Sequence, residues 1–266
     1  MLPSVLTFSK HPKLVLKKNT SIQLLNTLDE RIQLINQQGI ANVIIQDFDE
    51  SFANLTALEF VEKILVNKLN IGMLCMGYNH RFGKDRTGDF IQLQNIGKRY
   101  NFLVSEIPKE ELNQCDISST TIREALNQGE IAQANRFLGY SYKLEGVVVH
   151  GKNLGKEIGY PTANILMEDE LKLIPKNGVY LVQSEIKGML VNGLMNIGNK
   201  PTVHGKTLTI EVHLLEFNED LYGKRITVSM LKYLRPEQKF GSLSNLKEQI
   251  QKDEKIARFF FESYAQ

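Results

Sequence analysis

A glycine- and lysine-rich segment spans residues 151–164 and reads GKNLGKEIGYPTAN. Its glycines recur at four-residue spacing with lysines among them, and the positions of interest are Gly151, Lys152, Gly155 and Gly159. Backbone N–H groups in such a loop, together with lysine ammonium groups, can approach a phosphate closely. The glycines alone would equally suit a flexible hairpin that ends in a proline turn.

The end of this segment favours phosphate and metal binding over a plain hairpin. Pro161-Thr162-Ala163-Asn164 supplies a hydroxyl at Thr162 and a carbonyl oxygen at Asn164. Both are hard oxygen ligands of the kind that Mg²⁺ prefers. We therefore expect Thr162 and Asn164 to bind a metal ion, and the loop before them to bind phosphate.

A second candidate is a carboxylate in residues 207–214, TLTIEVHL, where polar and apolar residues alternate strictly. The alternation predicts a strand with one apolar face, and it puts Glu211 and His213 on the other face. Glu211 can take a proton from a substrate hydroxyl. For an isolated strand, a solvated carboxylate on an exposed face is the commoner role, and nothing in the sequence gives His213 a special one.

Two segments of the first half also carry polar groups in suggestive places. GYNHRFG at residues 77–83, with Asn79 and Arg81, follows a predicted strand, where α/β sheets bind their ligands. SSTTIR at 118–123 combines hydroxyls, a helix N-terminus and Arg123, which fits an anion site. Ordinary helix capping beside a surface arginine explains the second segment equally well.

The elements that must position these residues change in kind along the chain. The first half alternates short apolar strands with helices, two of which open on the capping boxes TLDE at 27–30 and TALE at 56–59. That alternation predicts a parallel sheet covered on both faces. After Gly139 the pattern has period two, with strands expected at 143–149, 178–186, 190–196, 207–215 and 225–231. Such strands favour an antiparallel barrel or a sandwich, followed by a helix over about 243–261.

Composition limits the class of protein. The chain has 266 residues, enough for about two domains, and its 32 basic and 30 acidic residues give a net charge of +2. This balance argues against a nonspecific nucleic-acid binder. Two cysteines are too few for a disulfide framework or a Cys-only zinc site and suit a reducing compartment. We see neither a membrane span nor a signal peptide, and expect a soluble cytoplasmic protein.

Taken together, the motifs resemble a known family, the bacterial bifunctional riboflavin kinase/FMN adenylyltransferases, also called FAD synthetases. The resemblance runs from about Val5 to Ala257, with the motifs in the family's order. In the second half they are GKNLGKEIGYPTAN (151–164), NGVY (177–180), NIGNKPT (196–202), EVHLLEF (211–217), LYGK (221–224) and LRPEQKF (234–240). In the first half they are TFSKHP (7–12), GYNHRFG (77–83) and SSTTIR (118–123), with Lys10 where the family usually has proline.

The resemblance implies two modules. Residues 1–139 would form an α/β nucleotidyltransferase-like domain with a Rossmann-like parallel sheet that joins AMP to FMN. Residues 140–266 would form an antiparallel Greek-key β-barrel with a C-terminal helix. This barrel would move the γ-phosphate of ATP to the 5′-hydroxyl of riboflavin, giving FMN.

The resemblance also assigns roles to individual residues. Glu211 would be the catalytic base, and Thr162 and Asn164 would hold Mg²⁺ and the phosphates of ATP, the co-substrate. Arg235 and Phe240 would contact the flavin. The matching residues of the adenylyltransferase would be Asn79, Arg81, Ser118, Thr120 and Arg123.

The first strand of the family is followed by a G-x-F-D-G-x-H-x-G-H segment whose histidines contact ATP phosphates, and this sequence has no such segment. We therefore expect an N-terminally incomplete first domain and a weak FMN adenylyltransferase. The alternatives are a complete bifunctional enzyme with a mis-assigned start, and a non-catalytic flavin- or nucleotide-binding protein. The sequence does not predict the oligomeric state.

Overall fold

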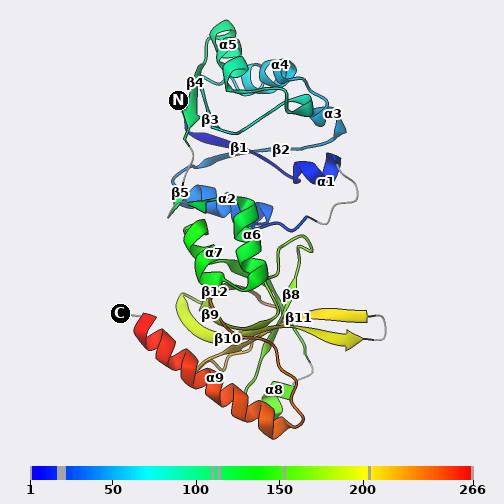
Figure 1. Ribbon diagram of the computed structural model, residues 1–266, viewed down its shortest axis with the longest axis vertical. Coiled ribbons are helices and arrows are strands. Elements are labelled where there is room, and N and C mark those ends of the chain that lie inside the picture. The colour runs from blue at the N-terminus through cyan, green and yellow to red at the C-terminus, as the bar shows by residue number, and fades with distance from the viewer. Residues whose placement is uncertain are drawn as a thin grey trace. The chain divides into compact units, whose positions relative to one another are not determined.

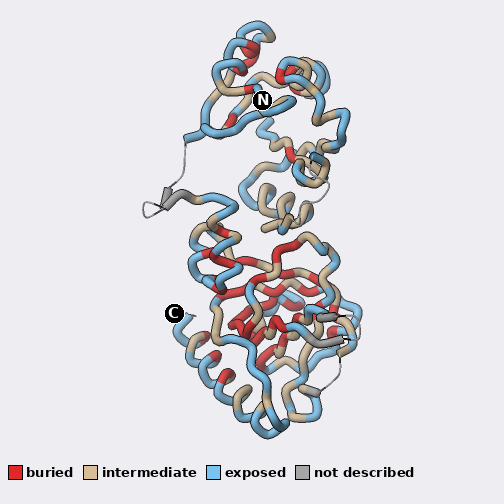
Figure 2. Tube along the Cα trace, turned by 45° about the vertical axis from the view of Figure 1, so that its right-hand side comes forward, coloured by how far each residue is buried: buried red, intermediate tan, exposed pale blue. Residues whose placement is uncertain are grey.

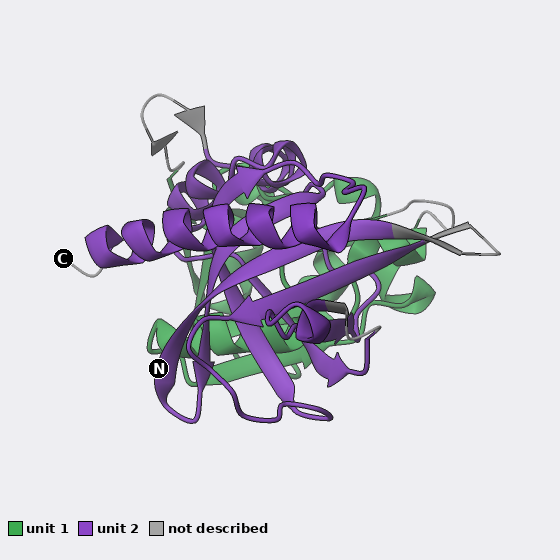
Figure 3. Ribbon diagram, turned by 90° about the horizontal axis from the view of Figure 1, so that it is seen from below, with its two compact units in different colours: residues 1–116 green, residues 117–266 purple. Residues whose placement is uncertain are grey.

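The structure is a computed structural model that describes residues 2–16, 22–108, 111–112, 115–151, 154–202 and 205–264. Contacts group the chain into two compact units, residues 1–116 and residues 117–266 (Figure 3). The first is an α/β unit and the second is built around a barrel (Figure 1). The boundary between the units, at residues 116–117, lies ahead of the change of pattern that the sequence shows after Gly139.

In the first unit, short strands pair in parallel, as alternation of strands and helices predicts. Strand β1 (Ser4–Phe8) pairs with β2 (Asn42–Gln46), and β3 (Met73–Gly77) pairs with β4 (Leu103–Ile107). Between them lie α1 (Pro12–Leu16), α2 (Leu28–Gln37), α3 (Glu50–Ala53), α4 (Ala57–Phe60), the π-helix η1 (Val61–Val66), the 3-10 helix η2 (Lys84–Arg86) and α5 (Phe90–Tyr100). Strands β5 (Glu111–Leu112) and β6 (Cys115–Asp116) form a small antiparallel pair.

Both predicted capping boxes are present in this unit. At the start of α2, the Thr27 hydroxyl accepts a hydrogen bond from the Glu30 N–H, and the Glu30 carboxylate accepts one from the Thr27 N–H. Thr56 and Glu59 make the same reciprocal pair at the start of α4. Each pair satisfies two N–H groups that a helix start leaves without partners, which fixes where the helix begins.

The second unit contains two helices, α6 (Ser119–Gln128) and α7 (Ile131–Leu138), and a closed antiparallel barrel. Around the barrel the strands follow the order β10, β11, β8, β7, β12, β9, which confirms the barrel and excludes the sandwich. Their bounds are β7 (Lys143–Val149), β8 (Ala163–Met167), β9 (Gly178–Ile186), β10 (Met189–Thr202), β11 (Gly205–Leu214) and β12 (Arg225–Arg235). The short α8 (Leu154–Glu157) precedes β8, and α9 (Leu243–Tyr264) ends the fold.

Alternation along each strand separates the barrel interior from its outer face. Figure 2 shows buried residues concentrated in the strands of the barrel. Helix α9 covers part of the outer face, where Ala257 and Phe261 pack with Leu181, Leu194 and Leu215. The outer face is therefore apolar and shielded from water where α9 covers it. Polar side chains can lie on the part of this face that α9 leaves uncovered.

The strand bounds correct two expectations. The strand expected at 190–196 is longer than predicted, because β10 runs on to Thr202. Residues 163–167 were not expected as a strand but form β8. Helices α6 and α7 pack with the barrel, since the Asn135 side chain donates to the Met230 carbonyl at 2.8 Å. The functional division into 1–139 and 140–266 stays a prediction.

Candidate functional site

The polar face of the barrel is centred on Glu211 of β11. Its register partners are Asn164 of β8 on one side and Asn196 of β10 on the other. The neighbours Ile210 and Val212 are 3% and 1% exposed, so they point inward and Glu211 points outward. Opposed residues of antiparallel strands share a face, with Cβ atoms about 4.5–5.5 Å apart. The fold therefore brings one carboxylate and two amides into a row.

Gly151 lies against this row. A Cβ atom built on Gly151 would come 2.1 Å from Nδ2 of Asn164 and 3.0 Å from its Oδ1. The backbone that leaves β7 thus passes directly over the Asn164 amide, and a side chain at position 151 would displace that amide. Two candidate residues that the sequence separates are in contact in the fold.

The rest of the glycine-rich segment folds back on itself before β8. The Gly155 carbonyl accepts hydrogen bonds from the Tyr160 N–H at 2.7 Å and the Ile158 N–H at 3.2 Å. A Cβ on Gly155 would come 2.2 Å from the Tyr160 carbonyl, and Gly159 adopts φ +88°, a left-handed conformation that favours glycine. Half-buried Thr162 follows this turn, and Lys152 lies outside the described residues.

His213 has a structural role that the sequence did not indicate. Its Nδ1 atom hydrogen-bonds with the Pro161 carbonyl at 2.8 Å, and its ring meets that of Tyr160 edge-on at 5.3 Å. Burial, followed by the negative charge of Glu254, raises the pKa of the Tyr160 phenol. The His213 contacts tie the segment before Thr162 to β11, the strand that carries Glu211.

Arg235, expected to contact flavin, makes a buried ion pair instead of pointing freely into the site. Its Nε lies 3.0 Å from both carboxylate oxygens of Asp253 on α9, and its Nη2 lies 2.7 Å from one of them. Its Nη1 donates to the Pro236 carbonyl at 3.0 Å. Asp253 is 2% exposed and also accepts from the Gln249 amide at 2.9 Å. A flavin contact by Arg235 stays a prediction, as does one by half-buried Phe240.

The sequence holds a signal for Asp253. In the helix expected over about 243–261, helical spacing puts the apolar residues Leu246, Ile250, Ala257 and Phe260 on one face. Position 253 falls on the same face at helical spacing. An aspartate on an apolar helix face needs a buried cationic partner.

In the first unit, the segment GYNHRFG forms a turn after β3. Asn79 is exposed, and Arg81 makes an ion pair with Asp89 at 2.9 Å. Asp89 in turn caps α5 by accepting from the Gln92 N–H at 2.8 Å. Burial, and then the charge of Arg86, lower the pKa of His80. Arg81 therefore helps to hold the start of α5, and its nucleotide contact stays a prediction.

The segment SSTTIR lies in the second unit and opens α6. Ser118 is the predicted N-cap, and its hydroxyl accepts from the Thr121 N–H at 3.1 Å. Arg123 donates from Nη1 to the Ser119 carbonyl at 3.0 Å, and Thr120 is exposed. Capping is confirmed, whereas an anion site at these residues stays a prediction.

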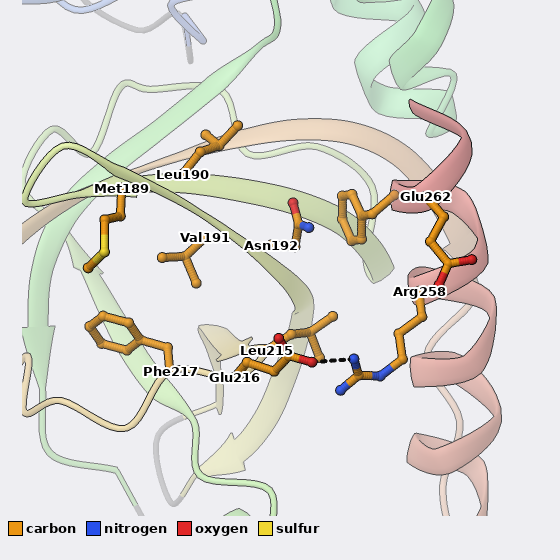
Figure 4. A pocket seen from close by; sticks show the side chains of 10 residues that line it. Met189, Leu190, Val191, Asn192, Leu215, Glu216, Phe217, Arg258 and Glu262 are labelled. Carbon is orange, nitrogen blue, oxygen red and sulfur yellow. Dashed lines mark hydrogen bonds and ion pairs between the residues drawn. The ribbon is translucent and has the colours of Figure 1, made fainter. Parts of the chain in front are cut away.

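A groove of about 450 Å³ opens elsewhere on the second unit (Figure 4). It lies between the start of β10 and the last turns of α9, and Leu190 at its edge is 66% exposed. Arg258 meets Glu216 in it at 2.5 Å and also pairs with Glu254. The Arg258 guanidinium already has two carboxylate partners, so it is less available to a ligand. We therefore favour the row around Glu211 as the functional site.

In the described part of the chain, no three His, Cys, Asp or Glu side chains gather closely enough to hold a metal ion. None of the described helices is both long and apolar enough to cross a membrane.

Comparison with family models matches two families in succession. Residues 1–121 match the model described as FAD synthetase, and residues 138–261 match the model described as riboflavin kinase. The two matches together cover most of the chain and fall on the α/β part and the barrel.

Similar proteins extend this result over nearly the whole length. A bifunctional riboflavin kinase/FMN adenylyltransferase from Haemophilus influenzae is 38% identical over 98% of this chain and 84% of its own. Proteins of that name from Escherichia coli K12 and Bacillus subtilis are 38% and 34% identical, each over 97% of this chain and 82% of its own. A crystal structure described as a macrolide-efflux protein from Streptococcus pneumoniae superposes with a TM-score of 0.87 at 32% identity, covering 96% of this chain and 83% of that one.

Proposed function

This chain belongs to the bifunctional riboflavin kinase/FMN adenylyltransferase family, and from that membership we propose how its barrel carries out the kinase reaction. As a riboflavin kinase it transfers the γ-phosphate of ATP to the 5′-hydroxyl of riboflavin, giving FMN and ADP. The chain also carries the FAD synthetase domain of the family. The proposal concerns which residues do the work.

Glu211 is the proposed general base. Its carboxylate takes the proton of the riboflavin 5′-hydroxyl while that oxygen forms a bond to the γ-phosphorus and the bond to ADP breaks. The position suits the role because Glu211 points out of the barrel, away from the apolar interior marked by Ile210 and Val212. A substrate on the outer face can therefore reach its carboxylate.

Thr162 and Asn164 are the proposed ligands for Mg²⁺ and the ATP phosphates. Their side-chain oxygens are hard donors, and the Gly151 backbone lies against the Asn164 amide where a side chain would otherwise intrude. These residues fit a magnesium ion, which when bound would neutralise charge on the transferring phosphoryl group. Gly151, Lys152, Gly155 and Gly159 would border the phosphates.

The observation that carries the proposal is the register pairing of Asn164 with Glu211. It puts a phosphate-side ligand and a proton acceptor on adjacent strands and on one face. Phosphoryl transfer depends mainly on positioning of this kind and on electrostatic stabilisation.

The decisive experiment incubates the chain with riboflavin, ATP and Mg²⁺ and separates riboflavin, FMN and FAD. FMN that depends on Glu211 supports the proposal. Retention of flavin without ATP turnover would instead identify a non-catalytic binding protein. The same assay tests the weak FAD synthesis expected from the sequence, because FAD would appear beside FMN.

The adenylyltransferase residues remain part of the proposal. Asn79 and Arg81 would border FMN or the adenine base, and Ser118, Thr120 and Arg123 would bind a phosphate of ATP. The exposed free thiol of Cys75 suits a reducing compartment, so we infer that the reactions take place in the cytoplasm.

A further inference from the structure

A second carboxylate lies on the same barrel face as Glu211. A Cβ atom built on Gly198 of β10 would come 2.2 Å from Oε1 of Glu237 and 3.2 Å from its Oε2. The Glu237 carboxylate therefore occupies the space where a side chain at 198 would stand. Gly198 has no left-handed backbone angle, so a side chain at this position would meet the Glu237 carboxylate rather than strain the backbone.

The segment that carries Glu237 is firmly anchored. Arg235, two residues earlier, is held by the buried carboxylate of Asp253, and the intervening Pro236 fixes one backbone angle. The Pro236 carbonyl also accepts from the Arg235 guanidinium. The backbone from which the Glu237 side chain projects is therefore held in place beside Gly198.

Register places Glu237 on the side of Glu211 away from the proposed phosphate ligands. Asn164 flanks Glu211 on β8, whereas Gly198 lies on β10, two residues beyond the other flanking residue, Asn196. Residues two apart on a strand share a face and are separated by about 7 Å. Across the outer face, the proposed phosphate ligand Asn164 therefore comes first, the proposed base Glu211 next, and the Glu237 carboxylate, over Gly198, last.

We propose that Glu237 accepts hydrogen bonds from the ribityl hydroxyls of riboflavin and so determines specificity for the polyol chain. This inference rests on the proposed function. A carboxylate is an acceptor only and repels a triphosphate, so it suits the substrate that carries hydroxyl donors. The ribityl chain runs from the flavin ring to the terminal 5′-hydroxyl, which Glu211 would deprotonate. With that end at Glu211, the remaining hydroxyls of the chain can extend toward Glu237. Capture of this chain would orient the reacting hydroxyl.

The test compares two flavins and three variants. Binding of riboflavin and of lumiflavin, which has the ring system but no ribityl chain, is followed by flavin fluorescence. Glu237→Gln should weaken riboflavin binding about tenfold, because bonds to a charged acceptor are the stronger ones, and should leave lumiflavin binding unchanged. Gly198→Ala should act likewise, since its new methyl group displaces the carboxylate. The double variant should lose no more than either single variant.

Glu185→Gln is the matched control, because it removes the same charge from an exposed position on β9. It should bind both flavins like the wild type, and circular dichroism should show all variants folded. Equal weakening for both flavins, or no weakening in Glu237→Gln, would overturn the inference. Failure of the wild type itself to bind riboflavin would instead refute the proposed function.

Discussion

Asn164 on β8 and Glu211 on β11 are direct partners in the antiparallel ladder of the barrel. One belongs to the segment that suggested phosphate binding and the other to the strand that suggested a proton acceptor. Opposed residues share a face with Cβ atoms about 4.5–5.5 Å apart. In the proposed mechanism, this pairing keeps the phosphate ligand and the general base on neighbouring strands.

Glu211→Gln should abolish most FMN formation while the barrel stays folded. The substitution keeps the size of an outward-pointing side chain and removes its ability to accept a proton. A general base contributes about 10²–10⁴-fold in rate, so kcat should fall by a factor in that range. The rate of FMN production at saturating riboflavin and ATP measures this kcat.

Glu185→Gln again serves as the control variant, and it should form FMN at the wild-type rate. Riboflavin binding by Glu211→Gln, followed by fluorescence, should persist. Near-normal kcat in Glu211→Gln would reject Glu211 as the base.

Thr162→Ala and Asn164→Ala should impair the use of MgATP more than riboflavin binding. Each substitution removes one hard oxygen ligand from the side of the site where phosphate charge develops. Riboflavin carries no phosphate and does not require those oxygens. Initial rates at varied ATP and Mg²⁺ measure the use of MgATP, and riboflavin titrations measure riboflavin binding. Equal weakening of MgATP use and of riboflavin binding would contradict the assignment.

Gly151→Ala should reproduce the Asn164→Ala defect while Thr162 and Asn164 themselves are kept. The new methyl group would lie 2.1 Å from the Asn164 amide nitrogen, so the amide must move. We expect a higher KM for ATP and an unchanged affinity for riboflavin. Gly241→Ala, just before α9, has nothing within 4 Å of its Cβ position and no left-handed backbone angle, so it serves as the steric control. A wild-type KM in Gly151→Ala would show that the amide position does not matter.

Local sequence rules predicted the elements whose signals are local. The capping boxes at Thr27 and Thr56 and the helix start at Ser118 appear where the side-chain spacing placed them. Strand β8 was missed because Pro161 and the preceding glycines read as a continuous loop. The strand expected at 190–196 extends to Thr202, because residues 197–202 pair with β11 despite their polar and glycine content. Long-range pairing outweighs local propensity in sheets.

The site was predictable as a set of residue types but not as an arrangement. Thr162, Asn164 and Glu211 were identified by chemistry and by resemblance, whereas their adjacency depends on strand order, which no local pattern encodes. The close approach of Glu237 to Gly198 depends on a loop fastened by Arg235 and Asp253. Such tertiary contacts appear only once the strands have closed.

Acid should remove the stabilising effect of the second capping box. The hydrogen bond from the Thr56 backbone, and then the one from Lys63, lower the pKa of Glu59 from 4.5 to about 2. A lowered carboxyl pKa stabilises the fold above the unfolded value and loses that effect as pH falls through the folded value. Wild type should therefore resist urea better than Glu59→Gln above pH 4.5, and the difference should vanish toward pH 2. A difference that is constant with pH would contradict this.

Asp253→Asn should strongly destabilise the second unit. The substitution keeps the size of the side chain but leaves the Arg235 guanidinium buried without its charge partner; the two side chains are only 16% and 3% exposed. Removing one partner of a buried ion pair costs about 3–5 kcal/mol. Arg258→Gln breaks pairs in which Arg258 is 45% exposed and its partners Glu216 and Glu254 are 74% and 22% exposed, and should cost less than about 1 kcal/mol. Urea unfolding followed by circular dichroism compares the two. Equal, small losses would show that the Arg235–Asp253 pair is dispensable, and would remove the anchor that we assign to Glu237.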